Sequence, residues 1–114
     1  MATRYYIRLN DPANARGSDA DLAFKSGGAE GFASELEDAL RTTDLFERWK
    51  AKQEDPDEVD QGLAAVDLNS TVTAEHHDLY IDLVVVTSVP GAVFKHRVKL
   101  LAGGNWQLSD VKAA

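Results

Sequence analysis

The sequence predicts an α+β domain, with two to three helices packed on one face of an antiparallel sheet. Three observations lead to this fold class. Apolar and polar residues alternate near the N-terminus, an amphipathic helical pattern follows over residues 29–41, and alternating segments divided by turn residues occupy the second half. We expect a single domain over residues 1–114, because two cores of about 57 residues each would be marginal in a chain without cysteine.

The first half predicts one strand followed by helices. Residues 4–9 alternate in the period-two pattern of a half-buried strand. Within residues 29–41, apolar side chains recur at spacings of three and four and form one helix face. A second helix is expected from Asp44, which is followed by Glu47 as in a capping box. That helix must end before Pro56, where a further helix-start signature begins.

The second half predicts a four-stranded antiparallel meander from about residue 65 to residue 111. Loops at residues 75–78 and 103–105 would connect its outer strands. Leu68 and Leu79 are expected on the core face of this meander. The N-terminal strand would join the same sheet, at a position that local patterns do not fix.

A tight turn sets the expected register of the meander. Residues 89–92 fit a type II turn, because proline presets the first central residue and glycine accepts the positive φ of the second. Such a turn would pair Leu83 with Val98 on the core face and Asp82 with Lys99 on the opposite face. A slip of one residue would exchange the two faces, so the pattern argues for this register.

Charge is distributed unevenly along the chain. The net charge is −7, and residues 54–82 contain nine acidic residues without any Lys or Arg. This balance disfavours nucleic acid and anionic lipid as partners, since both are anions. The apolar runs are far shorter than the roughly 20 residues of a membrane helix, and the N-terminus lacks the apolar core of a secretory signal. We therefore expect no membrane partner and a cytoplasmic location.

Metal ligands cluster only at residues 75–78, which read Glu-His-His-Asp. Adjacent histidines on a strand point to opposite faces, and no further ligand follows at a recognisable spacing. We therefore interpret this segment as a polar hairpin tip and expect no metal. The acidic run at residues 55–60 lacks the spacing of an EF-hand and fits a helix N-terminus. No phosphate-binding glycine motif is present, so no cofactor is expected.

The first functional interpretation is a small, acidic, non-enzymatic binding protein of the adaptor, chaperone or inhibitor type. The acidic segment would steer a basic protein partner. Lys95, Arg97 and Lys99 would form a charge-paired stripe on the outer sheet face, beside two exposed valines that suit a partner or a homodimer mate. The predicted partner-binding residues are Asp57, Asp60, Asp67, Val84 and Val86.

The alternative interpretation is a domain that binds a small molecule in an internal cavity. Helices followed by a long meander that ends in Gly-Asn-Trp-Gln-Leu resemble cystatin-like and NTF2-like folds, which are cone-shaped. The resemblance is at the level of the fold and implies no catalytic residue. His96 is expected on the core face, where a buried neutral imidazole or a general base would both fit. The candidate ligand-binding residues are His96, Asp110, Trp49 and Tyr5.

Overall fold

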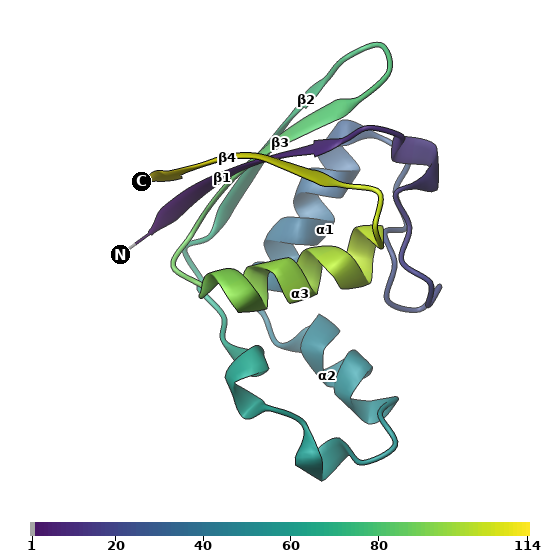
Figure 1. The fold of residues 1–114 in the computed structure, drawn as a ribbon, viewed down its shortest axis with the longest axis vertical. Coiled ribbons are helices and arrows are strands. Elements are labelled where there is room, and N and C mark those ends of the chain that lie inside the picture. The colour runs from purple at the N-terminus through teal and green to yellow at the C-terminus, as the bar shows by residue number, and fades with distance from the viewer. Residues whose placement is uncertain (1) are drawn as a thin grey trace.

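The computed structural model describes residues 2–114 and has the predicted α+β class. Three α-helices and four β-strands make up the regular structure of the described chain (Figure 1). The strands are β1 (Thr3–Leu9), β2 (Thr71–His76), β3 (Ile81–Thr87) and β4 (Gln107–Ala113). The helices are α1 (Ala29–Arg41), α2 (Asp44–Ala51) and α3 (Gly91–Ala102), with short 3₁₀ turns at Pro12–Asn14, Pro56–Glu58 and Gln61–Ala64.

The four strands form one antiparallel sheet in the order β2-β3-β1-β4. The N-terminal strand β1 therefore lies in the middle, between β3 and β4. The larger elements follow the order β-α-β-β-α-β, which is the ferredoxin-like or split βαβ arrangement, with α2 and the 3₁₀ turns inserted between α1 and β2.

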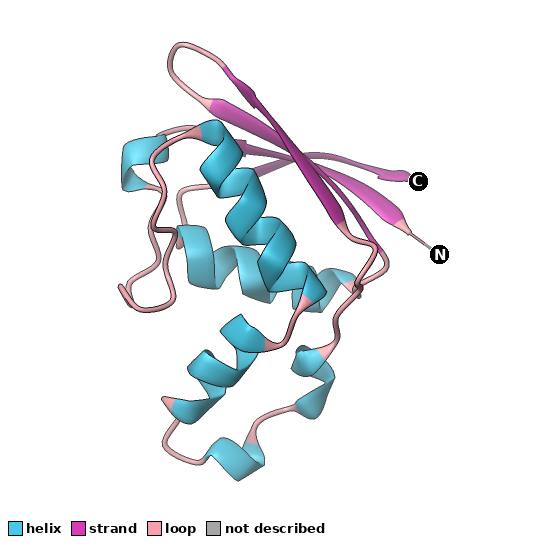
Figure 2. Cartoon of the chain, turned by 180° about the vertical axis from the view of Figure 1, so that it is seen from behind, coloured by secondary structure: helices cyan, strands magenta, loops and turns pink. Residues whose placement is uncertain are grey.

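The helices lie on one side of the sheet, as predicted (Figure 2). Alternate residues of β1 and β3 point from the inner face of the sheet into the core, in accordance with the period of two in a strand. Tyr5 stacks on Phe94 of α3, with ring centroids 4.1 Å apart, and Phe32 of α1 packs edge-on against Phe24. The most deeply buried apolar residues of this core are Ile7, Leu9, Phe32, Leu36, Leu40, Ile81, Leu83, Val85, Phe94 and Val98.

The predicted four-stranded meander is wrong in its third strand, because residues 91–102 form helix α3. Pro90 is the N-cap of this helix and does not begin a tight turn. Leu83 consequently pairs with Ile7 and Ala74, and Asp82 pairs with Arg8 instead of Lys99. The resemblance to cystatin-like and NTF2-like folds rested on the long meander, which the described chain lacks.

The inward positions of α3 explain the misreading. They recur with helical spacing at Val93, Phe94, Arg97, Val98, Leu101 and Ala102. Because one of these buried positions is an arginine, the apolar pattern looks interrupted at the helical period. The alternative pattern, with period two, contains only apolar residues and His96. The predicted basic stripe is therefore wrong too, since Arg97 is 0% exposed while Lys95 and Lys99 face solvent.

Arg97 ties α3 to two other segments. Its guanidinium donates hydrogen bonds to the carbonyl of Ala39 near the end of α1, and to those of Leu63 and Ala65 at 2.7 and 2.9 Å. The last four carbonyls of a helix have no partner within the helix, so one of these bonds satisfies the end of α1. The others hold the segment that carries the acidic residues against the core.

Two smaller predictions also need correction. Leu68 and Leu79 are 74% and 81% exposed, because the hairpin pairs Ala74 with Leu83 and leaves both leucines outside the strands. The N-cap of α2 is Thr43 and makes no side-chain capping bond. Asp44 lies inside the helix, and its carboxylate accepts a hydrogen bond from Arg48 Nε at 3.1 Å.

Candidate functional site

The outer face of the sheet is the main candidate surface. No helix of the described residues lies over it, as both views of the ribbon show (Figures 1 and 2). Tyr6, Val84 and Val86 project from the two central strands on this face and are half-buried. They form an apolar centre that the fold itself does not cover. Of these residues the sequence analysis singled out the valines but not Tyr6, because the central position of β1 has no local signal.

Charged side chains surround this apolar centre in pairs. Arg8 and Asp82 are opposite each other on neighbouring strands, and their two hydrogen bonds measure 2.8 and 3.1 Å. The ring of Tyr80 lies against the Arg8 guanidinium, 3.9 Å from ring centroid to Cζ. His77 stacks on Tyr80 and places Nε2 3.4 Å from Asp82 Oδ2. Asp82 and Tyr80 hold the pKa of Arg8 above its usual value, and the two hydrogen bonds pair the Arg8 charge with Asp82 at this polar border.

The predicted acidic partner surface divides into two unlike parts. Asp57 and Asp60 lie in the lobe of residues 54–60, far from the sheet in Figure 1, and both are exposed. No carboxylate of this lobe forms an ion pair within the described chain. Asp67 is different, because its carboxylate accepts hydrogen bonds from the backbone N–H groups of Ser88 and Asn69, both at 2.9 Å. These bonds lower the pKa of Asp67 and give it a structural role.

The residues proposed for a small-molecule site are only partly brought together. Trp49 and His96 meet edge to face, with ring centroids 4.5 Å apart, and line a half-open hollow of about 300 Å³. Tyr5 is stacked in the core, and Asp110 lies on β4 opposite Tyr6 on the outer face, so neither lines this hollow. The other lining residues are Ser18, Asp19, Leu22, Lys99 and Leu100.

His96 is neutral in this environment at neutral pH. Burial lowers its pKa from the usual value of 6.5, and the charges of Arg97 and Lys99 lower it further. Its Nδ1 atom is buried without a hydrogen-bond partner in the described structure. Among the described residues no carboxylate forms a hydrogen bond with this imidazole, as a general base would need, and Asp110 lies on the opposite side of the sheet.

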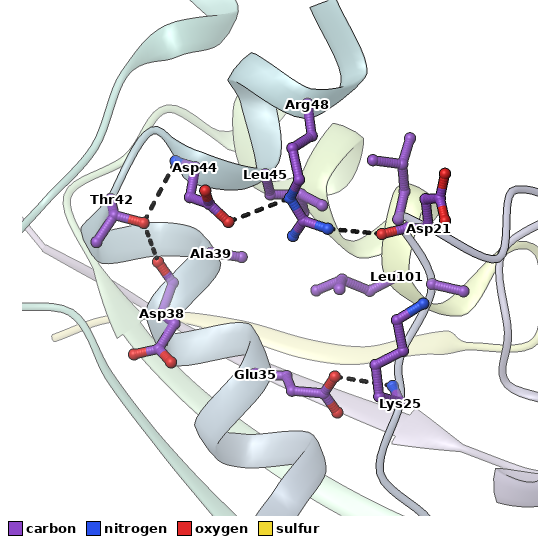
Figure 3. A pocket seen from close by; sticks show the side chains of 12 residues that line it. Asp21, Lys25, Glu35, Asp38, Ala39, Thr42, Asp44, Leu45, Arg48 and Leu101 are labelled. Atoms are coloured by element: carbon purple, nitrogen blue, oxygen red, sulfur yellow. Dashed lines mark hydrogen bonds and ion pairs between the residues drawn. The ribbon is translucent and has the colours of Figure 1, made fainter. Parts of the chain in front are cut away.

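A second cleft lies between the loop at residues 21–25, α1 and α2 (Figure 3). Its polar groups bond to one another. Arg48 bridges the Asp44 carboxylate and the Asp21 carbonyl, the latter at 2.6 Å. Glu35 accepts the backbone N–H groups of Lys25 and Ser26 at 2.8 and 3.0 Å. These bonds fold the loop onto the helices.

At the hairpin tip the two histidines separate, and His77 Nε2 lies 3.6 Å from Glu75 Oε1 and 3.4 Å from Asp82 Oδ2. His76 is exposed at the end of β2, whereas His77 turns back toward Tyr80 and Asp82. Residues 2–114 contain no group of three or more His, Cys, Asp or Glu side chains placed to hold a metal ion.

Comparisons with known proteins give no family for this chain. No protein-family model matches it, and searches of curated proteins and of solved structures found no match. Among the described residues, no helix is both long and apolar enough to span a membrane.

Proposed function

We propose that this protein is a non-enzymatic binding protein that contacts a protein partner through the outer face of its sheet. One observation carries the proposal. Tyr6, Val84 and Val86 form an apolar centre on a face that no described helix covers. Apolar patches with a polar border are typical of protein contact surfaces, because covering them removes apolar area from water.

The border of this face favours a protein over nucleic acid. Across its three strand-crossing rows this face carries equal numbers of cations and carboxylates: Arg4, Arg8 and Lys112 against Glu75, Asp82 and Asp110. Such a neutral border offers no excess of cations to phosphate groups, which dominate nucleic-acid affinity. We further place this binding in the cytoplasm, an assignment that fractionation of native cells tests.

Site-specific photo-crosslinking tests the proposal. A photoreactive amino acid at Thr73, which is exposed on the outer face opposite Val84, should capture a discrete partner in native extract. The same photoreactive group at Leu79, on the exposed hairpin tip, is the matched control and measures non-specific crosslinking. Adding Val84→Asp to the Thr73 probe should abolish the capture while circular dichroism stays unchanged. Equal capture from both positions, or capture that survives Val84→Asp, would reject this face as the contact.

A second candidate function is favoured by the hollow at Trp49. An indole ring and two leucines form its apolar walls. Lys99 lies at the same hollow and makes no ion pair in the described chain, whereas the Asp19 carboxylate at this hollow is paired with Lys52. This combination fits a small aromatic carboxylate. In a Trp106→Phe background, the remaining tryptophan reports directly on binding, so naphthoate should quench its fluorescence saturably. Lys99→Gln should weaken that binding at least tenfold. Linear, unsaturable quenching would exclude a site there.

A further inference from the structure

The two edges of the sheet are protected unequally. At β2, α1 covers the start of the edge: Glu37 accepts the Val72 N–H at 3.0 Å, and Arg41 Nε donates to the Ser70 carbonyl at 2.7 Å. Edge strands are commonly protected in such ways against pairing with another chain. Strand β4 has no such cover from the described helices. Within the described residues its protection is local: the Asp110 carboxylate accepts the Val111 N–H at 2.8 Å, and Lys112 Nζ lies 3.8 Å from Asp110 Oδ2.

The backbone groups that β4 turns outward can be assigned from the ladder. Ala114 N–H donates to the Ala2 carbonyl, so these two residues are a hydrogen-bonded pair. Antiparallel ladders alternate, and the pairs of Lys112 with Arg4 and Asp110 with Tyr6 continue the same series. The N–H and C=O groups of Val111 therefore point away from β1, toward the open edge. Its side chain is also 46% exposed, which is unusual for a large apolar residue in the sheet.

The sequence around Val111 is complementary to itself. When β4 pairs antiparallel with β4 of a second copy and Val111 lies opposite Val111, each Asp110 lies opposite a Lys112. A shift of one pairing step in either direction instead places Asp110 opposite Asp110, or Lys112 opposite Lys112. Opposite charges that face each other across strands stabilise pairing, and like charges oppose it. Charge thus favours this register over the two neighbouring ones.

We propose that the protein forms a twofold dimer by antiparallel pairing of β4 with β4 of a second copy, centred on Val111. In this pairing the outward N–H and C=O groups of Val111 bond to their own symmetry mates, as an isologous interface requires, and the N–H exchanges its bond to Asp110 for the bond across the dimer. It covers the exposed Val111 side chains and joins two four-stranded sheets into one. The outer face remains open in this dimer, so the inference is independent of the proposed function.

A charge-exchange series tests the pairing. Sedimentation equilibrium of the full chain, from about 10 μM to about 1 mM, covers the affinities expected for a small interface. The wild-type chain should dimerise in this range. Asp110→Lys or Lys112→Asp alone places like charges opposite each other twice and should raise the dissociation constant at least tenfold. The double variant exchanges the two charges, restores both pairs and should recover dimerisation.

Two further variants separate pairing from other effects. Val111→Pro removes an N–H that faces the open edge and not β1, so it should abolish the dimer while circular dichroism remains that of the folded chain. Val84→Asp, on the outer face, should leave the dimer intact. A chain that stays monomeric up to 1 mM overturns the proposal, as does a dimer that the single charge variants leave unchanged. A dimer lost in Val84→Asp would mean that copies meet through the outer face instead.

Discussion

Replacing Arg97 by Met should destabilise the protein by about 2–4 kcal/mol. Methionine keeps an unbranched apolar stem in the buried space and removes the guanidinium. The Ala39 carbonyl then loses its donor in a fully buried position, which costs about 1–3 kcal/mol. The carbonyls of Leu63 and Ala65 belong to half-buried residues, so water replaces part of their bonding and each costs about 0.5–1 kcal/mol. Removing the buried guanidinium, which has no carboxylate partner, also removes its desolvation penalty and offsets part of this loss of stability.

Urea denaturation followed by circular dichroism measures this loss. Lys95→Met is the matched control, because Lys95 is exposed on the same helix and its change should stay within about 0.5 kcal/mol. Hydrogen exchange should also accelerate at residues 61–65, which Arg97 holds from α3. Arg97→Lys should give an intermediate loss, since one ammonium cannot span the three carbonyls as a planar guanidinium does. The reasoning is refuted if Arg97→Met is as stable as the wild-type chain. The desolvation penalty of the buried guanidinium would then equal the free energy gained from its hydrogen bonds.

Three further predictions concern the core, a histidine and the acidic lobe. Leu83→Ala should cost about 2–5 kcal/mol in urea denaturation, because Leu83 is completely buried in the central strand β3. The pKa of His96 is below 6.5 in the folded chain, so at a pH below that value the unfolded chain binds more protons than the folded chain does. The free energy of unfolding should therefore decrease as the pH falls below 6.5. The decrease should be smaller in His96→Gln, which lacks the titrating group. For any basic partner that the protein binds, Asp57→Asn combined with Asp60→Asn should lower the association rate, and most of that difference should vanish in high salt. Glu30→Gln, an exposed change on α1, should lower the rate less, and equal rates for both variants would show that the lobe does not steer the partner.

The elements that sequence patterns predicted well are those whose core face is wholly apolar. Helix α1 matches its predicted range of residues 29–41, because its inward side chains obey the helical period without exception. Strands β1 and β3 were visible for the same reason at a period of two. Helix α3 has the buried Arg97 at an inward position, which interrupts the helical apolar pattern. The period of two then fits better, and the segment is wrongly assigned as a strand.

The candidate surfaces depended on contacts that no local pattern encodes. The meeting of Trp49 with His96 joins α2 to α3, and the apolar centre of the outer face needs β1 between β3 and β4. The packing of the whole core determines which strands pair when they are distant in sequence. Local sequence patterns therefore do not predict the order of the strands in the sheet. Val84 and Val86 were still recognised as outward-facing, because alternation within a single strand already assigns the two faces.

The arrangement of the helices determines where this protein can bind. Helices α1 and α3 pack on the inner face, and α2 lies farther from the sheet on the same side (Figure 1). Helix α1 also secures the start of the β2 edge through Glu37 and Arg41. The unprotected backbone and apolar groups are therefore concentrated on the outer face and along β4. A partner on the outer face would approach perpendicular to the sheet, whereas a second copy at β4 would approach in the plane of the sheet. A dimer paired through β4 would present two outer faces side by side. Self-association would use the border charges of Asp110 and Lys112 and leave the apolar centre of each outer face free for partner binding.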